Sequence, residues 1–258
     1  MPTIVMTEKP DTWFAYRHLN PQARLRLFCF PYAGGSASIF ANWSSFLPAW
    51  VEVCPIQLPG RENRINETPL KRLSALVDRL VEALLPVSDL PFTFFGHSMG
   101  ALISFELARR LRQRDLPLPC QLFISGCGAP QVHVSEPPVY HLPKEEFIAA
   151  VKRLNGTPEE VWRHEELVKI LLPYLRADFE MIDTYIYQPD LPLPMPFTVY
   201  GGQQDQKVQP ERLGAWSEQT TKACVLRIFP GDHFFVHSSR QQLLTTLSQE
   251  LKLIKSIA

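Results

Sequence analysis

Short apolar runs alternate with amphipathic stretches through the first half of the chain. Runs rich in β-branched and aromatic residues predict strands at Arg24–Phe30, Val51–Gln57, Phe92–Phe95 and Gln121–Ser125. Apolar residues at helical spacing predict helices at Ser38–Leu47, Leu70–Leu85 and Met99–Arg114. This alternation is typical of an α/β fold, in which right-handed crossovers build a mostly parallel sheet with helices on both faces.

The alternation stops after Gly128 and resumes about 70 residues later, although a crossover needs only about a dozen residues. The interval contains helical patterns at Lys144–Leu154, Pro158–Trp162 and Glu165–Tyr187. Pro173 is expected to end or kink the last of these helices. The segments after the interval predict a strand at Phe197–Tyr200, a helix near Glu211–Glu218, a strand at Cys224–Phe229 and a helix at Ser238–Lys255. We therefore expect one α/β domain over residues 1–258, with a helical insertion, or lid, at about residues 130–195.

Composition and charge exclude several classes of partner. The chain has 26 basic and 26 acidic residues, so it lacks the field that would hold nucleic acid or an anionic membrane. The first residues include Glu8, Lys9 and Asp11, and they do not form a targeting segment. The five cysteines form no C-x-x-C pair, which favours a reducing cytoplasm and argues against a structural metal. We expect a cytoplasmic monomer with no metal, nucleic-acid partner or membrane partner.

The segment Gly96–Gly100 (GHSMG) matches the pattern G-x-S-x-G, between a predicted buried strand and a predicted helix. Glycines suit this sharp turn because side chains two positions before and after the serine would collide. The turn would lift the Ser98 hydroxyl above the sheet edge, at the positive end of the following helix. The alternative is a helix-capping serine with incidental glycines. We predict that Ser98 is the nucleophile of a serine hydrolase.

In such hydrolases the acid and the histidine follow the nucleophile in the chain. His233 lies in a loop directly after the strand predicted at Cys224–Phe229, and Asp205 lies in a turn after Phe197–Tyr200. We predict that His233 is the base and that Asp205 accepts its Nδ1 proton, with a simple turn aspartate as the alternative. The remaining candidates are expected to have other roles: His97, His237, Asp178, Asp183, Asp190 and Asp232.

A hydrolase of this kind also needs two backbone N–H groups that bind the oxyanion. One is expected at Met99, directly after the nucleophile. The other is expected in the loop Pro31–Gly35, where we favour Ala33 over Tyr32. The alternative for this loop is a plain tight turn.

Five segments in this order resemble the type II thioesterases, the stand-alone editing enzymes of polyketide and nonribosomal peptide synthesis. They are FPYAGG at Phe30–Gly35, QLPGRE at Gln57–Glu62, FFGHSMGA at Phe94–Ala101, GxxDxxV at Gly202–Val208 and GDHFF at Gly231–Phe235. The resemblance implies an α/β-hydrolase fold and hydrolysis of acyl thioesters on the 4′-phosphopantetheine arm of carrier proteins, while some relatives release medium-chain fatty acids. It implies no cofactor beyond the arm of the substrate. It implies Ser98, Asp205 and His233 as catalytic residues, with oxyanion donors at Ala33 and Met99.

The resemblance also implies that the lid shapes an acyl pocket. We expect substrate contacts at Tyr32, Arg61, Phe147, Trp162, Phe179 and Phe234, although the lid side chains among these could equally form the core of the lid. Four basic residues could face an acidic carrier protein or simply form a solvated surface: Arg61, Arg64, Lys71 and Arg72. The segment Ser125–Pro130 (SGCGAP) departs from the family's SGRRAP, so it leaves the preferred substrate and carrier undefined.

Two other functions are compatible with the sequence. A soluble carboxylesterase or lipase would share the sharp turn at Ser98 (the nucleophile elbow) and the catalytic triad of Ser98, Asp205 and His233, but it would leave the segment Leu58–Arg61 without a role. A non-catalytic binding protein could use the same fold to hold a ligand under the lid, but it would not need all three triad residues.

Overall fold

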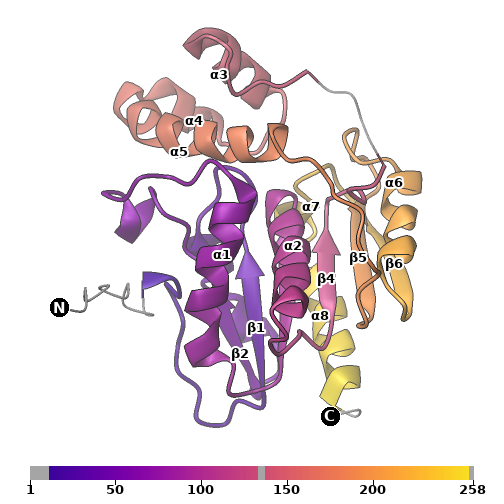
Figure 1. Cartoon of the computed structure of the whole chain (residues 1–258). Helices are drawn as coiled ribbons and strands as arrows, with labels where there is room; N and C mark the ends of the chain where they lie inside the picture. Colours follow the sequence, from indigo (N-terminus) through magenta and orange to yellow (C-terminus); the bar gives the residue numbers. More distant parts are fainter. Residues whose placement is uncertain (1–11, 133–136, 256–258) are drawn as a thin grey trace, which may run out of the picture.

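A parallel sheet of six strands forms the centre of the computed structural model, which describes residues 12–132 and 137–255 (Figure 1). The strands are β1 Leu25–Phe30, β2 Val51–Pro55, β3 Phe92–His97, β4 Leu122–Ser125, β5 Phe197–Gly202 and β6 Cys224–Phe229. Their order across the sheet is β2-β1-β3-β4-β5-β6. Because β1 lies between β2 and β3, the chain changes direction across the sheet at β1. In open α/β sheets a crevice forms beyond the carboxyl ends of the strands at such a point.

The strand register brings the chain segments with candidate chemistry together at that edge. Phe30, the last residue of β1, pairs with Gly96 near the end of β3. Gly202 at the end of β5 likewise pairs with Phe229 at the end of β6. The loops after β1, β3, β5 and β6 therefore leave the same edge of the sheet.

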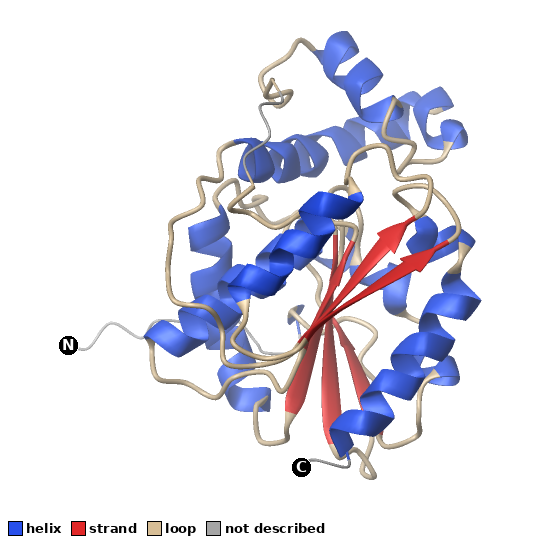
Figure 2. Cartoon of the chain, turned by 90° about the vertical axis from the view of Figure 1, so that its right-hand side faces the viewer, coloured by secondary structure: helices blue, strands red, loops and turns tan. Residues whose placement is uncertain are grey.

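Alternate strand residues fill two separate cores. Phe28, Phe30 and Phe94 point to one face, where they pack with apolar residues of α1 (Leu73–Leu84) and α2 (Met99–Gln113). Leu27, Cys29 and Phe95 point to the other face and pack with apolar residues of α8 (Arg240–Lys255). Figure 2 shows helices on both sides of the fanned strands. Burial on both faces explains why the strands are almost continuously apolar.

Three helices lie between β4 and β5 in the chain: α3 Lys144–Lys152, α4 Glu159–Arg163 and α5 Glu165–Asp183. In Figure 1 they extend across the top of the molecule, over the carboxyl ends of the strands. Their inner apolar residues form a third core, which includes Phe147, Leu171, Leu175 and Phe179. After β5 come α6 (Pro210–Gly214) and a 3₁₀ helix at Ala215–Gln219, and after β6 comes α7 (Phe235–Ser238).

Two details differ from the elements expected from sequence. The helix predicted at Ser38–Leu47 is instead two 3₁₀ turns, Ala37–Phe40 and Trp43–Phe46. Phe40 ends the first turn and Trp43 begins the second, and both rings pack against the buried Phe95. Two short turns instead of one regular helix let both rings reach this side chain.

Pro173 was expected to end or kink the third helix of the insertion, but α5 continues through it to Asp183. A proline removes one helical hydrogen bond and crowds the preceding turn. The buried residues on both sides of Pro173, including Leu171 and Leu175, provide the packing that keeps the helix continuous.

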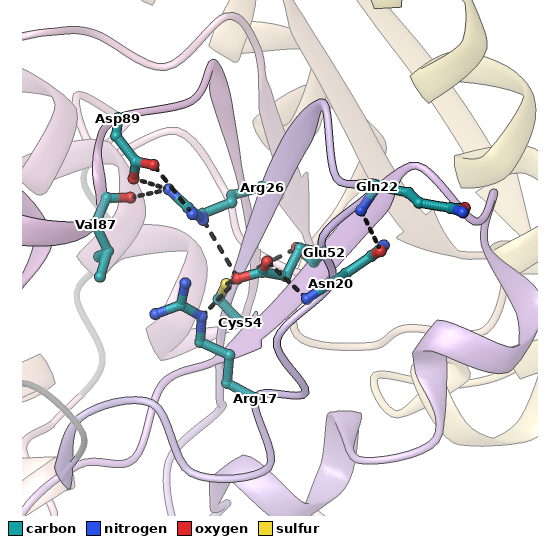
Figure 3. A network of polar contacts seen from close by, with 8 residues as sticks. All are labelled: Arg17, Asn20, Gln22, Arg26, Glu52, Cys54, Val87 and Asp89. Carbon is teal, nitrogen blue, oxygen red and sulfur yellow. Dashed lines mark hydrogen bonds and ion pairs between the residues drawn. The ribbon is translucent and has the colours of Figure 1, made fainter.

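A network of charged side chains lies at the opposite, amino-terminal end of the sheet (Figure 3). Glu52 of β2 is buried and pairs with Arg17 and with Arg26 of β1. Arg26 also donates to the Val87 carbonyl and to Asp89. This network joins the segment before β1 to the first two strands and to the turn before β3.

Within the described ranges, no helix is long and apolar enough to cross a membrane, and no group of three or more potential metal ligands is found. The charged residues near the start of the chain, Glu8, Lys9 and Asp11, lie outside the described residues.

Candidate active site

Ser98 occupies a strained turn between β3 and α2. Its backbone has φ 53° and ψ −115°, which a residue with a side chain rarely adopts. A Cβ atom on Gly96 would lie 2.1 Å from the Gly100 carbonyl oxygen, and one on Gly100 would lie 2.0 Å from the Phe30 carbonyl oxygen. Both glycines are therefore required by backbone contacts, and the strand, turn and helix have the arrangement of a nucleophile elbow.

The structure brings Ser98, His233 and Asp205 together. The His233 Nε2 atom lies 3.1 Å from the Ser98 Oγ atom, and the His233 Nδ1 atom lies 2.8 Å from the Asp205 Oδ2 atom. The other oxygen of Asp205 accepts the N–H groups of Lys207 and Val208 at 2.8 and 3.2 Å. The turn after β5 therefore fixes the carboxylate, and the carboxylate fixes the imidazole. This geometry allows the histidine to take a proton from the serine.

The surroundings of Asp205 keep it ionised. Burial by itself raises the pKa of this carboxyl. The hydrogen bond and charge of His233, with the N–H groups of Lys207 and Val208, outweigh burial and hold the pKa of Asp205 below its usual value. A negative charge next to the imidazole stabilises the protonated form that appears when the serine loses its proton.

Two other histidines near the site have different partners, as expected from sequence. The His97 Nδ1 atom lies 2.8 Å from the Ser125 Oγ atom, and burial holds the pKa of His97 well below its usual value. The His237 Nε2 atom lies 2.8 Å from the Tyr32 hydroxyl. These contacts hold the rings of His97, His237 and Tyr32 around the base of the His233 loop.

The backbone around Ser98 offers two N–H groups of the expected kind. Met99 is the first residue of α2, so its N–H has no acceptor within the helix. The chain turns at residues 32–35, where the Gly35 N–H donates to the Tyr32 carbonyl at 2.9 Å and Gly34 has φ 79°. Ala33 occupies this turn and lines the same cavity as Ser98. Within the described part of the chain, no hydrogen bond is found for the Ala33 N–H.

A cavity of about 340 Å³ opens beside Ser98 and His233. Its wall is mostly apolar and comes largely from the insertion, through Val139, Ala150, Val151, Leu154, Phe179 and Ile182. Among the residues expected to contact substrate, Tyr32, Phe179 and Phe234 line this cavity. The Phe234 ring also packs on Gly156 so closely that a Cβ atom there would lie 2.3 Å from it. The cavity has the size and lining of a site for a small apolar group.

The other three residues expected to contact substrate do not line this cavity. Arg61 is buried and pairs with Asp178, so it is not part of a solvated basic surface, and neither is Arg64, which is also buried. Phe147 is fully buried, with its ring edge-on to Phe179 at 5.6 Å. Trp162 packs on the outside of the apolar core of the insertion.

Sequence reasoning missed several residues of the site. Ala150 and Leu154 of the first helical pattern line the cavity, as does Ile182 near the end of α5. The spacing was a detectable signal, since Leu154 lies three residues after Val151 and four after Ala150, and Ile182 lies three residues after Phe179. Residues three or four apart share one helix face. Asp178 was considered only as a catalytic acid, and its bonds to the loop after β1 have no local sequence signal.

Both the sequence and the fold of this chain are similar to those of known proteins. A sequence model for the family described as "Thioesterase domain" matches residues 25–251. The gramicidin S biosynthesis protein GrsT of Aneurinibacillus migulanus is 47% identical over 244 residues, which cover 95% of each chain. The type II thioesterase BorB from the borrelidin biosynthetic cluster has a similar structure, with a TM-score of 0.83, 33% identity and coverage of 95% of this chain and 98% of BorB. YbtT, a type II thioesterase from the yersiniabactin NRPS/PKS biosynthetic pathway, has a TM-score of 0.79, 30% identity and coverage of 92% and 96%.

Proposed function

Since this chain belongs to the type II thioesterase family, we propose that it hydrolyses acyl thioesters on the 4′-phosphopantetheine arm of carrier proteins in polyketide or nonribosomal peptide synthesis. The observation that carries the proposal is the hydrogen-bonded series Ser98, His233 and Asp205 beside an apolar cavity. Removal of a wrong or stalled acyl group would return the carrier to use. The similarity to YbtT supports this setting, since YbtT is a type II thioesterase from an NRPS/PKS biosynthetic pathway.

The first half of the proposed reaction transfers the acyl group to Ser98. His233 takes the Ser98 proton at Nε2 while Oγ attacks the thioester carbonyl carbon. The N–H groups of Ala33 and Met99 bind the oxygen, which becomes negative in the tetrahedral intermediate. When the C–S bond breaks, the arm leaves as a thiolate and receives the proton held by His233.

The second half releases the acid. A water molecule gives a proton to His233 and attacks the carbonyl of the acyl-Ser98 ester. The C–O bond to Ser98 then breaks, the proton returns to its Oγ, and the carboxylic acid leaves. The buried, ionised Asp205 holds the Nδ1 proton of His233 in both halves and stabilises the imidazolium.

We also interpret helices α3 to α5 as a lid on a single domain, because apolar side chains of α3 and α5 line the cavity beside Ser98. The acyl chain would lie against these side chains, and the phosphopantetheine arm would extend from the thioester beside Ser98 to the carrier protein outside the cavity. We further propose a monomer in the cytoplasm, where a reducing environment would keep the five free cysteines unpaired.

The test is hydrolysis of acyl groups from loaded carrier proteins, with and without Ser98. The Ser98→Ala variant should lose at least about a thousandfold in kcat, because the nucleophile is removed. The same substitution at the exposed Ser45 is the matched control and should retain full activity. Activity of Ser98→Ala within severalfold of wild type would refute the role of Ser98.

A substrate panel separates the proposal from the esterase and binding-protein alternatives. Acyl carriers, the matching pantetheine and coenzyme A thioesters, and oxygen esters should be compared at equal concentration. We expect the highest kcat/KM for acyl carriers. Equal or better hydrolysis of oxygen esters would favour a carboxylesterase. A binding protein would turn over none of them and would leave Ser98 unlabelled by a fluorophosphonate.

A further inference from the structure

Two buried charged side chains hold the turn after β1. The Asp178 Oδ2 atom accepts the Gly34 N–H at 2.8 Å. Arg61 donates from Nη1 to the Gly35 carbonyl at 2.9 Å. Both side chains come from distant parts of the chain, since Arg61 follows β2 and Asp178 lies in α5. The turn that carries Ala33 is therefore bonded to a second loop and to the helical insertion.

Arg61 and Asp178 also bind each other in a two-point arrangement. The Nη1–Oδ2 distance is 2.8 Å and the Nη2–Oδ1 distance is 2.7 Å. The two side chains are 2% and 1% exposed. The guanidinium lies 4.7 Å from the centre of the Tyr174 ring, which is also in α5. A buried ion pair of this kind contributes little net stability, because desolvation offsets the attraction. Its main effect is to fix direction, since two parallel hydrogen bonds leave little freedom of rotation.

The same face of α5 also contacts the turn through an apolar side chain. Leu175 lies three positions before Asp178, on the same side of the helix. A Cβ atom on Gly34 would lie 2.7 Å from the Leu175 Cδ1 atom. With φ 79°, Gly34 adopts a conformation that suits glycine alone. Helix α5 therefore packs directly on the turn, and no side chain separates them at Gly34.

We propose that Asp178 and Arg61 are positioning residues that aim the Ala33 N–H at the oxyanion. The inference rests on the proposed function, in which Ala33 is an oxyanion donor. The Gly34 N–H and the Ala33 carbonyl belong to one rigid peptide plane. When Asp178 fixes that plane, rotation about the Ala33 Cα–C bond is fixed relative to α5. The Gly35 carbonyl is fixed in the same way by Arg61. The oxyanion site is therefore complete only when α5 is seated on the turn.

The proposal predicts a specific loss in the transition state. A trifluoromethyl ketone analogue of acyl-pantetheine reacts with Ser98 to form a tetrahedral oxyanion, whereas a thioether analogue carries no carbonyl at that position. The Asp178→Ala variant should lose about tenfold to a hundredfold in kcat and in affinity for the ketone, because a displaced donor binds the oxyanion poorly. Its affinity for the thioether should remain within about twofold of wild type.

Two further variants keep the test informative if Asp178→Ala folds poorly. The double variant Arg61→Met with Asp178→Leu replaces the buried pair by apolar side chains, a change that buried ion pairs often tolerate. It should be folded, as judged by thermal unfolding, and should show the same loss in kcat and in ketone affinity. The Asp178→Asn variant retains an acceptor for the Gly34 N–H. Its kcat and its affinity for the ketone should therefore be higher than those of Asp178→Ala.

The matched control is Glu180→Gln on the same helix. Glu180 pairs with Lys71 and Arg72 and so ties α5 to the segment before α1 without contacting the turn. It should keep wild-type kcat and ketone affinity. If Glu180→Gln shows the same loss, a general attachment of the insertion is responsible and the positioning role is wrong.

Equal losses for the ketone and the thioether in Asp178→Ala, or no loss for either, would also overturn the inference. The substrate assignment can fail separately. If wild type does not hydrolyse acyl carriers but the ketone result is as expected, the positioning role stands and the proposed substrate does not. If wild type hydrolyses acyl carriers but the Asp178→Ala variant binds the ketone as well as wild type does, the proposed substrate stands and the positioning role is wrong.

Discussion

His97 and His233 lie close together, with ring centroids 5.4 Å apart, but their surroundings differ. His97 is fully buried against the floor of the site, where Ser125 is its hydrogen-bond partner. His233 is partly exposed and lies between Ser98 and Asp205. At the scale of single residues, proximity to the nucleophile therefore does not determine a role. The partners of each ring nitrogen determine it.

The buried His97 predicts a measurable pH dependence of stability. Burial, the largest cause, and the charges of His233 and His237 lower the pKa of His97, so the folded state keeps it neutral. In the unfolded chain a histidine takes up a proton as pH falls below about 6.5. The unfolded state then binds more protons, and stability should fall by up to about 1.4 kcal/mol per pH unit below that value from this residue alone.

The His97→Gln variant should remove this contribution, while its amide can still bind Ser125. Urea unfolding at several pH values between 7.5 and 5 measures the slope. The difference in unfolding free energy between wild type and variant should decrease as pH falls. The same substitution at the exposed His164 tests whether loss of any one histidine changes the slope. An unchanged difference across this range would contradict the prediction.

How far the site can be predicted from the sequence depends on how local its causes are. The elbow has a local pattern, since a Cβ atom on Gly96 would meet the Gly100 carbonyl within one turn, although one on Gly100 would meet the Phe30 carbonyl of β1. The positions of Asp205 and His233 follow from a general rule, because loops after parallel strands share one edge. The partnership of Arg61 and Asp178 follows from neither. It depends on how α5 packs on the turn after β1, and a buried arginine has the same local sequence pattern as an exposed one.

At the scale of elements, the insertion contributes most of the wall of the cavity. Its helices were predictable in number and approximate extent from apolar spacing, apart from the expected break at Pro173. Which of their faces turns toward Ser98 was not predictable, since both Phe147 and Phe179 occupy apolar positions. The structure places Phe179 in the cavity wall and Phe147 in the core behind it.

Helix α3 offers a test of the acyl pocket. Ala150 is buried and lines the cavity, whereas its neighbour Ala149 is exposed and does not. The Ala150→Phe variant should fill part of the cavity. We expect kcat/KM for a long-chain acyl carrier to fall about tenfold relative to an acetyl carrier, because the added ring occupies space that the long chain needs and a mismatch of one group in an apolar pocket costs about 1–3 kcal/mol. Ala149→Phe is the control and should leave the ratio unchanged. An equal effect of both variants would show that the chain does not lie beside Ala150.

At the scale of the whole molecule, the two ends of the sheet carry different tasks. The candidate site lies at the carboxyl ends of the strands. The charged network of Glu52, Arg17 and Arg26 lies at the amino-terminal end and joins segments that are far apart in the sequence (Figure 3). The hydrogen bonds and ion pairs of Glu52 outweigh its burial and hold its pKa below the usual value, so the network is charged at neutral pH.

This separation predicts that stability can be lost without loss of catalysis. The Glu52→Gln variant leaves Arg26 buried beside a neutral side chain, and we expect a loss of about 3 kcal/mol in unfolding free energy. The kcat of the folded enzyme should stay within about twofold of wild type. Denaturant unfolding and steady-state kinetics on one preparation measure both quantities. A large fall in kcat with unchanged stability would contradict the separation of tasks.

The bonds between α5 and the turn at residues 32–35 have a consequence for protein engineering. A designer who grafts the insertion of a relative onto this scaffold to change chain-length preference would treat the stretch between β4 and β5 as an exchangeable cassette. The cassette is not self-contained, because its Asp178 is matched to an arginine that lies well outside it. Chimeras that carry over only the cassette should be folded but slow unless Arg61 and Asp178 are kept, or exchanged, together.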